Sequence, residues 1–262
     1  MPNTGPFNRP TEGTRRAWIT GAGKGIGRAL ALALAAEGWW VAASARTKPD
    51  LDSLADEADG LSGHIHVMPL DVCDEAAMGV AVEGIEQAIG PLDLAVLNAG
   101  THRPVGLADF SPELFRQLFE VNVMGVVNGL AAVLPRFRER GGGHVAVVAS
   151  LAGYRGLPTA AAYSMTKAGV IALCESLKPE LDRAHIALTL INPGFVRTPL
   201  TDRNDFPMPF LISAEDAAAV IMRGLARRDF EIAFPKPFAL AMKCLRILPD
   251  FLFFRMASRW LP

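Results

Sequence analysis

Three side chains in the middle of the chain could together move a proton. Tyr163 and Lys167 are four residues apart, which places both on one face of a helix, and Ser150 precedes Tyr163 by thirteen residues. A phenol with a pKa of about 10 is a poor acid–base group at neutral pH, but a neighbouring ammonium favours the phenolate. A shift of about three pKa units requires roughly 4 kcal/mol, which we expect Lys167 and a positively charged cofactor ring to supply. Ser150 would hold a substrate oxygen while Tyr163 gives or takes its proton. Taken alone, such a Tyr–Lys pair is also common on helix surfaces.

A glycine-rich stretch near the start of the chain could hold a pyrophosphate. Residues 16–27 are typical of a short apolar strand, a tight turn and the start of an apolar helix that extends to about residue 38. The free N–H groups and positive dipole end of such a helix attract anions. The common dinucleotide fingerprint fails here, because its sixth position, normally glycine, is Ile26. The spacing is instead Thr20-Gly21-x-x-x-Gly25-x-Gly27, with a further glycine at Gly23. A glycine-rich loop without a ligand remains the alternative.

The end of the second expected strand, residues 39–44, bears on the choice of cofactor. Dinucleotide-binding folds that prefer NAD place an acidic residue there, on the 2′-hydroxyl of the adenosine ribose. The residues that follow here are Ala45, Arg46 and Thr47, with no acid among them. The guanidinium of Arg46 could bind a 2′-phosphate, and Lys24 could add a second cation. We therefore expect NADP(H) to be preferred over NAD(H), although Arg46 could also be a solvated loop residue.

Composition and charge place the chain in an ordinary globular class. Of its 262 residues, 50% are hydrophobic and 20% are charged, and the net charge of −1 gives no sign of a nucleic-acid-binding surface. The three cysteines are far apart, so we expect reduced packing residues of a cytoplasmic protein and no metal site. The first 14 residues lack the apolar core of a secretory signal and are expected to be a loose tail. No uninterrupted apolar run reaches about 18 residues, so no spanning helix is expected.

Apolar runs typical of strands alternate with helical segments from residue 15 to residue 235, which we expect to form a single domain. The expected strands cover residues 16–20, 39–44, 64–70, 92–97, 144–149, 186–191 and 231–234. The expected helices cover residues 25–38, 50–58, 74–89, a segment from Ser111, 121–134, 160–184 and 213–225. This alternation predicts an α/β fold with a doubly wound, mainly parallel seven-stranded sheet and helices on both faces.

Several residues are expected to shape the helices. Asp74 and Ser111 are predicted N-caps, and Ser213 forms a capping box with Asp216. Pro179 should bend or weaken the last turns of the 160–184 helix. The 121–134 and 160–184 helices are mostly apolar, which favours contact with a second copy in a homodimer or homotetramer.

In a parallel sheet, ligands bind outside the carboxyl ends of the strands. That rule gathers the glycine turn and the residues after each strand along one edge, where they resemble the short-chain dehydrogenase/reductase family over about residues 15–235. The motifs that carry the resemblance are Thr20-Gly21-x-x-x-Gly25-Ile26-Gly27, Asp71-Val72, Asn98-Ala99-Gly100, Asn122, Ser150, Tyr163-x-x-x-Lys167 and Pro193-Gly194 with Thr198. The resemblance implies a Rossmann-type fold and an NAD(P)-dependent oxidoreductase. Leu97 and Ala149 stand where the family usually has Asn and Ser, and neither change removes a reacting group.

The resemblance also implies roles for individual residues. Tyr163 is the catalytic acid–base, and Ser150 orients the carbonyl. Lys167 binds the nicotinamide ribose and tunes Tyr163, while Asn122 holds a water in a proton relay. The full set of expected cofactor contacts is Gly21, Gly23, Lys24, Gly25, Ile26, Gly27, Arg46, Asp71, Val72, Asn98, Ala99, Gly100, Tyr163, Lys167, Pro193, Gly194, Val196 and Thr198.

The loop over residues 195–212 is expected to cover the substrate. Its apolar residues, together with three that follow Ser150, suggest a largely apolar pocket, unless the loop packs these side chains on itself. The residues concerned are Phe195, Phe206, Met208, Phe210 and Leu211 of the loop, and Leu151, Tyr154 and Leu157. His102 and Arg103 could meet a polar group of the substrate or be solvated.

The last 27 residues, 236–262, form an apolar and basic extension. Pro249 divides it into two segments of about a dozen residues, each too short to span a bilayer. Such an extension can dock on the body of the chain or on a partner subunit. It can also lie on a membrane surface as a basic amphipathic segment.

The sequence therefore predicts an oxidoreductase that transfers a hydride between NADP(H) and a carbonyl or secondary alcohol of a small hydrophobic molecule. A 3-oxoacyl thioester reductase is a narrower alternative, although the sequence has no clear basic patch for a carrier protein. A regulatory or scaffold protein that binds NADP without turnover is another. The intact set of Ser150, Tyr163 and Lys167 argues against this last alternative.

Overall fold

The computed structural model describes residues 13–203 and 208–259. The strands are β1 (Arg16–Thr20), β2 (Trp40–Ser44), β3 (His64–Val67), β4 (Leu94–Leu97), β5 (Gly143–Val148), β6 (Ile186–Pro193) and β7 (Glu231–Phe234). The α-helices are α1 (Gly25–Ala36), α2 (Lys48–Glu57), α3 (Glu75–Ile89), α4 (Pro112–Phe119), α5 (Gly125–Glu139), α6 (Ala161–Arg183), α7 (Ala214–Arg227), α8 (Lys236–Ile247) and α9 (Asp250–Ala257). Of the expected tail over residues 1–14, only residues 13 and 14 are described. Phe206 of the expected substrate loop, and Trp260 and Leu261 of the C-terminal extension, also lie outside the described residues.

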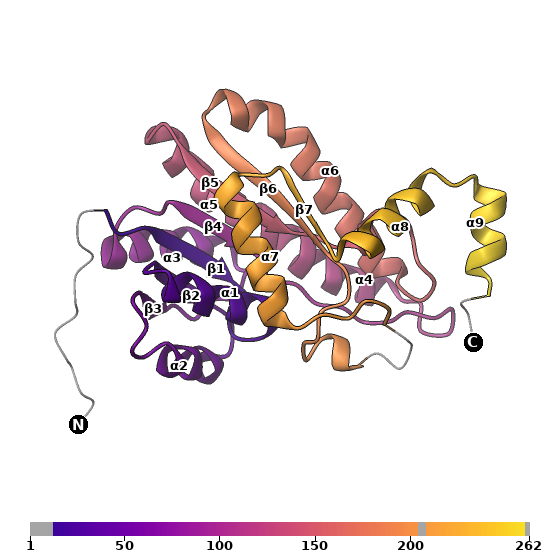
Figure 1. The fold of residues 1–262 in the computed structure, drawn as a ribbon, viewed down its shortest axis with the longest axis horizontal. Helices are drawn as coiled ribbons and strands as arrows, with labels where there is room; N and C mark the ends of the chain where they lie inside the picture. The colour runs from indigo at the N-terminus through magenta and orange to yellow at the C-terminus, as the bar shows by residue number, and fades with distance from the viewer. Residues whose placement is uncertain (1–12, 204–207, 260–262) are drawn as a thin grey trace.

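The strands of the described chain form one sheet in the order β3-β2-β1-β4-β5-β6-β7, and each neighbouring pair is parallel. The predicted doubly wound, seven-stranded sheet is confirmed (Figure 1). The strand order reverses between β1 and β4, which lie side by side although β2 and β3 come between them in the sequence. In sheets of this kind ligands bind at that reversal, outside the carboxyl ends of the strands.

Two apolar layers cover the sheet, with α3, α5 and α6 on one face and α1, α2 and α7 on the other. The side chains of a strand alternate between the two faces. In β1, Trp18 packs into the first layer and Ile19 into the second. The strands are therefore apolar on both sides, which explains why they appear in the sequence as continuous apolar runs.

The predicted N-caps are confirmed. The side chains of Asp74, Ser111 and Ser213 accept hydrogen bonds from backbone N–H groups three residues later, at 2.9, 3.4 and 3.0 Å. Pro179 does not end its helix, because α6 continues to Arg183. An ion pair between Lys178 and Asp182, at 2.5 Å, spans the turn that contains the proline.

One helical stretch among the described residues, 112–139, is long and apolar enough to cross a membrane by length and composition. The apolar runs of the sequence did not indicate it. It consists of α4, a π-helical turn η1 (Glu120–Met124) and α5. Val126, Leu130, Val133 and Phe137 of this stretch are buried in the layer that covers the sheet. Their burial identifies the stretch as a core helix.

His144 in β5 gives the fold a pH dependence. Its Nε2 lies 2.9 Å from the Thr189 hydroxyl, which itself donates to the carbonyl oxygen of Asp229 at 2.7 Å. The hydroxyl therefore accepts from His144, which is neutral. Burial lowers the pKa of His144 from 6.5 to about 4, with Arg228 adding to the shift. Between these values the unfolded chain binds a proton that the folded chain does not, so stability falls as the pH falls from 6.5 towards 4.

We expect a His144→Gln variant to remove this sensitivity while keeping a donor for Thr189. Between pH 7 and pH 5, the wild-type free energy of unfolding should fall by about 2 kcal/mol more than that of the variant. Urea denaturation at the two pH values measures the difference. Equal losses in the two proteins would show that His144 is not the responsible group.

Candidate active site

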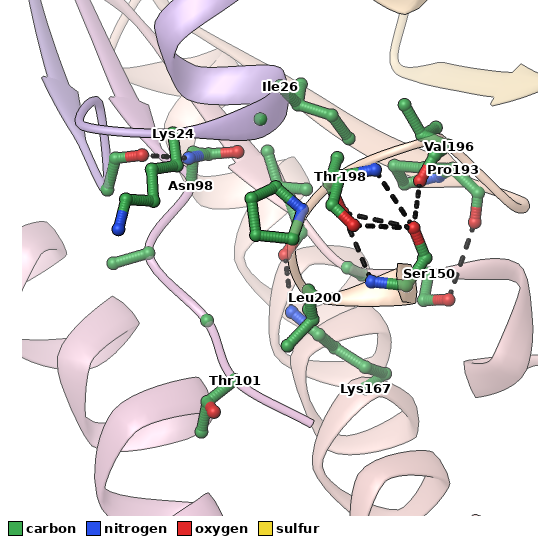
Figure 2. Close-up of a pocket in the computed structure, with 18 of the residues that line it drawn as sticks. Lys24, Ile26, Asn98, Thr101, Ser150, Lys167, Pro193, Val196, Thr198 and Leu200 are labelled. Carbon is green, nitrogen blue, oxygen red and sulfur yellow. Dashed lines mark hydrogen bonds between the residues drawn. The ribbon is translucent and has the colours of Figure 1, made fainter. Parts of the chain in front are cut away.

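A cleft of about 420 Å³ opens at the carboxyl ends of β1, β4, β5 and β6, beside the start of α1 (Figure 2). It brings together most of the expected site residues. These are Gly21, Lys24, Gly25, Ile26, Arg46, Asn98, Ala99, Gly100, Ser150, Tyr163, Lys167, Pro193, Gly194, Val196 and Thr198. Pro199, Leu200 and Thr201 of the loop expected over the substrate also line it, as do three residues that were not expected, Thr101, Val148 and Ala149.

The glycine turn fits tightly against the end of β4. Gly21 has a φ of +68°, and a Cβ there would lie 2.8 Å from Cα of Ala99. A Cβ on Gly27 would lie 2.4 Å from the carbonyl oxygen of Gly21 and 2.5 Å from Nδ2 of Asn98. Any residue other than glycine at either of these two positions would therefore push the turn away from β4. Gly27 packs against Gly21 and Asn98 and does not itself line the cleft.

Thr20 and Asn98 join the two strands that flank the cleft. The hydroxyl of Thr20 accepts from the backbone N–H groups of Asn98 and Ala99, at 3.0 and 3.1 Å. Nδ2 of Asn98 donates to the carbonyl oxygens of Thr20 and Gly21, at 3.0 and 3.2 Å. Thr20 was part of the sequence motif, but its side chain was not predicted to act. A threonine at the end of one strand gives no sign in the sequence of which neighbouring strand it will bind.

The start of α1 is suited to an anion. Lys24 at its N-cap makes no side-chain cap, and the first turn contains no acidic residue. The N–H groups and the positive end of the helix dipole are therefore left for a ligand. Arg46 is exposed and lines the same cleft, whereas the ammonium of Lys24 pairs with Asp50 at 3.1 Å. Arg46 is consequently the better placed of the two expected cations.

Ser150, Tyr163 and Lys167 face the cleft from β5 and α6. Ser150 starts a short 3-10 turn, where its hydroxyl accepts from the N–H of Ala152 at 3.1 Å. Lys167 is 3% exposed and donates from Nζ to the carbonyl oxygen of Val148, at 2.9 Å. Its Nζ lies 5.7 Å from the centre of the Tyr163 ring. The three side chains thus share one cavity, as a common ligand requires.

In the chain without a ligand the pKa of Tyr163 lies above its ordinary value, whereas the expected fall applies to the cofactor-bound chain. Burial raises the pKa of Tyr163, and the hydrogen bond with Ser150 opposes that rise only in part. Burial also lowers the pKa of Lys167 from 10.5 to about 8. The phenol is therefore protonated at neutral pH, while most of Lys167 is still charged. A protonated phenol can donate a proton to a substrate oxygen.

Asn122 does not line the cleft but braces the residues that do. It is fully buried in the π-helical turn η1. Its Oδ1 accepts from the N–H of Thr101 at 2.7 Å, and its Nδ2 donates to the carbonyl oxygen of Thr101 and to the hydroxyl of Thr166, at 2.9 and 3.1 Å. The hydroxyl of Thr166 donates to the carbonyl oxygen of Tyr163, at 2.7 Å. Asn122 therefore ties the end of β4 to the turn of α6 that carries Tyr163.

Three more expected cofactor residues lie outside the cleft. Asp71 is exposed, and its Oδ1 accepts from the N–H of Cys73 at 3.0 Å. Val72 is buried, and its carbonyl oxygen accepts from Nδ2 of Asn128 at 2.9 Å. Gly23 packs beside Asp50, whose Cβ would lie 3.1 Å from an added Cβ. Among the described residues, no cluster of His, Cys, Asp and Glu could hold a metal ion.

The pocket walls also differ from the expectation for the residues after Ser150. Leu151, Tyr154 and Leu157 do not line the cleft. The hydroxyl of Tyr154 instead donates to the carboxylate of Glu231 and accepts from Nδ2 of Asn192. His102 is half-buried, with its ring packed edge-on against Tyr163 at 4.7 Å between centres, and burial lowers its pKa. Arg103 is exposed.

Comparison with known proteins places the chain in a family. The sequence model of the short chain dehydrogenases matches residues 15–206. An uncharacterized oxidoreductase from Myxococcus xanthus is 40% identical over 245 residues, which cover 94% of this chain and 97% of that protein. The chain therefore belongs to the short chain dehydrogenase family of oxidoreductases.

Two further relatives show the range of similarity. A 3-oxoacyl-[acyl-carrier-protein] reductase from Thermotoga maritima is 36% identical over 185 residues, which cover 71% of this chain and 75% of that protein. The crystal structure of a short chain dehydrogenase/reductase from Burkholderia phymatum in complex with NAD superposes with a TM-score of 0.81 at 26% identity, covering 88% of this chain and 92% of that one. The fold is thus shared over nearly the whole chain.

Proposed function

We propose that the protein is an NADP(H)-dependent oxidoreductase that interconverts a carbonyl group and a secondary alcohol on a small hydrophobic molecule. The observation that carries the proposal is the convergence of Ser150, Tyr163 and Lys167 on the cleft that the start of α1 also faces. A protein of another class has no need to place a buried ammonium beside a phenol at an anion-binding helix end.

The residues present fit a nicotinamide dinucleotide. The turn at Gly21 leaves room that a Cβ would close, and the uncapped start of α1 suits a pyrophosphate. When bound, the nicotinamide supplies or accepts the hydride. The family resemblance assigns Lys167 to the nicotinamide ribose and Val196 and Thr198 to the carboxamide, and all three line the cleft. It also assigns Asp71 and Val72 to the adenine, although neither lines the cleft.

The side chains of the chain handle the proton. In reduction, Ser150 holds the carbonyl oxygen by a hydrogen bond, and Tyr163 donates its proton to the same oxygen. The charge of Lys167 stabilises the phenolate that remains. Oxidation of the alcohol reverses these transfers. Asn122 acts as a positioning residue, because its contacts hold the backbone of Thr101 and, through Thr166, that of Tyr163.

An NADPH-oxidation screen over aldehydes, ketones, steroids and 3-oxoacyl thioesters, repeated with NADH, tests the proposal. We expect turnover with at least one apolar carbonyl compound and a preference for NADPH. The Thermotoga maritima relative supports 3-oxoacyl thioesters as the second candidate substrate class. Turnover with thioesters alone would establish that narrower activity. Tight NADPH binding without turnover of any of these compounds would favour a regulatory protein.

We expect Arg46 to determine the preference for NADP(H). A guanidinium paired with a phosphate contributes about 1.5–3 kcal/mol, or roughly 10–100-fold in affinity. Arg46→Gln should raise the Kd of NADPH by that factor and change the Kd of NADH by less than about threefold. Lys48→Gln, at an exposed cation two residues away that pairs with Asp52, is the matched control. Equal effects of Arg46→Gln on the two cofactors would contradict the assignment.

We further propose that α5 and α6 contact a second copy of the chain in a homodimer or homotetramer. The mostly apolar composition of these helices supports the proposal, as do Phe119 at the end of α4 and Met165 in α6, which are 41% and 45% exposed. Sedimentation velocity of the full chain should show an assembly larger than one chain. A single-chain species at all concentrations would contradict this assembly.

A further inference from the structure

The C-terminal arm, defined as residues 236–259, exposes apolar and basic side chains together. Its α8 and α9 lie beyond β7 at one end of the molecule, with α9 farthest from the sheet (Figure 1). Five large apolar side chains of the arm are exposed, by between 43% and 83%. They are Leu240, Ile247, Phe251, Leu252 and Phe254. The arm also carries Lys236, Lys243, Arg246, Arg255 and Arg259, all exposed.

One face of the arm is docked on the chain itself. Ala239 and Met242 of α8 and Phe253 of α9 are buried. The guanidinium of Arg155 pairs with Asp250 at 2.5 Å and lies 4.4 Å from the centre of the Phe253 ring. The docking expected for this extension therefore occurs on the subunit's own body. It leaves the exposed side chains on other faces of the same helices.

The exposed apolar side chains follow helical spacing. In α8, Leu240, Cys244 and Ile247 are exposed at intervals of four and three residues, which places them on one face. In α9, Phe251 and Phe254 are three residues apart and likewise share a face. The buried residues, Ala239 and Met242 in α8 and Phe253 and Ala257 in α9, fall on other faces at 100° per residue. Both helices are thus amphipathic, with one apolar face used inside the chain and a second one outside it.

Charge separates the arm from the rest of the chain. The segment from residue 236 to the end holds five basic residues and one acid, a net charge of +4. The other 235 residues hold 21 basic and 26 acidic residues, a net charge of −5. The cores of protein–protein interfaces are depleted in charged residues. Helices that lie on a membrane surface instead combine Lys and Arg with Phe and Leu. The exposed faces of the arm have the second composition.

We propose that the C-terminal arm binds the surface of an anionic phospholipid membrane. Phe251, Phe254 and Ile247 enter the headgroup region, while the basic side chains pair with lipid phosphates and carboxylates, except Lys243, which pairs with Glu231. Neither helix is long enough to span a bilayer, since α8 has 12 residues and α9 has 8. The arm lies on the membrane and does not cross it.

The arm also contacts the loop that follows β6. Phe238 of α8 stacks on Phe195 and Phe210, at 5.5 and 6.2 Å between ring centres. A Cβ on Gly194, which lines the cleft, would lie 2.7 Å from the Phe238 ring. The start of the arm therefore packs directly against the wall of the cleft. This position suits an apolar carbonyl substrate that is dissolved in the bilayer, an inference that rests on the proposed function.

Flotation of the full chain with phosphatidylcholine vesicles, with and without phosphatidylserine, tests the membrane proposal. We expect binding only to the phosphatidylserine vesicles, weakened by high salt. Each basic side chain near an anionic surface contributes about fivefold to the partition coefficient, so Arg255→Gln with Arg259→Gln should lower it about 25-fold. Phe251→Ser with Phe254→Ser should lower it about tenfold or more.

Matched substitutions far from the arm provide the controls. Arg223→Gln in α7 removes an exposed charge, and Val80→Ser in α3 removes an apolar side chain that is 72% exposed. Neither should change vesicle binding. Absence of wild-type binding to phosphatidylserine vesicles would overturn the proposal, whatever the oxidoreductase activity. If Phe251→Ser with Phe254→Ser instead lowers the assembly size in sedimentation velocity, the arm is an interface between copies.

Discussion

Replacing Tyr163 by phenylalanine is expected to lower kcat about a thousandfold while the Kd of NADPH changes by less than about threefold. The substitution removes the hydroxyl that donates the proton and keeps the ring, which packs against His102. Cofactor affinity should survive, because the glycine turn, the start of α1 and Lys167 are untouched. Steady-state kinetics with the best substrate of the screen, together with fluorescence titration of NADPH, measure the two quantities.

The chain offers a close control for this experiment, because it contains two tyrosines, Tyr154 and Tyr163. The hydroxyl of Tyr154 contacts Glu231 and Asn192 outside the cleft. Tyr154→Phe should therefore keep kcat within about threefold, although loss of a buried hydrogen bond costs about 1–2 kcal/mol of stability. A Tyr163→Phe enzyme as active as the wild type would remove Tyr163 from the chemistry.

Replacing Lys167 by methionine should lower kcat/KM about a hundredfold or more, because the phenolate loses its neighbouring cation and the ribose loses a hydrogen-bond donor. The substitution should affect the stability of the folded chain differently from its activity. The pKa of Lys167 is about 8 in the folded chain and 10.5 as the ordinary value, so the folded chain bears a cost for the charge below pH 8. That cost disappears as the pH rises from about 8 to 10.5.

We therefore expect the cofactor-free Lys167→Met chain to be no less stable than the wild type at pH 7, to within about 1 kcal/mol. The wild type should gain stability relative to the variant as the pH rises from about 8 towards 10.5. Urea denaturation across this range measures the effect. Lys178→Met, on the same helix but in a surface ion pair, is the control and should keep full activity. Retained activity in Lys167→Met would refute its role.

Much of the fold could be predicted because parallel strands are buried on both faces. Runs such as residues 17–19 and 94–97 are apolar throughout, and caps such as Asp74 act on residues three positions away. The edge of the sheet that carries Gly21, Ser150 and Tyr163 followed from the order of strands and helices. These features depend on local sequence or on a general rule of sheet topology.

The remaining features depend on contacts between distant segments. The π-helical turn around Asn122 forms where that side chain reaches Thr101 and Thr166, and an apolar pattern does not show it. Tyr154 was placed in the pocket, but Asn192 and Glu231, some 40 and 80 residues away, hold its hydroxyl elsewhere. The pKa of Tyr163 was predicted to fall beside Lys167 and a positively charged cofactor ring, and in the chain without a ligand burial raises it. The burial of a single atom, here the phenolic oxygen of Tyr163, cannot be deduced from the spacing of residues in the sequence.

The central claim is that a nicotinamide cofactor bound over the glycine turn reacts beside Tyr163. Mixing the enzyme with NADPH deuterated at C4 and an apolar ketone, followed by mass spectrometry of the alcohol, tests it most directly. We predict that one deuterium reaches the former carbonyl carbon in the wild type and that Tyr163→Phe forms almost none of this product. Alcohol formed without deuterium from either C4-deuterated form of NADPH, or formed equally well by Tyr163→Phe, would contradict the account.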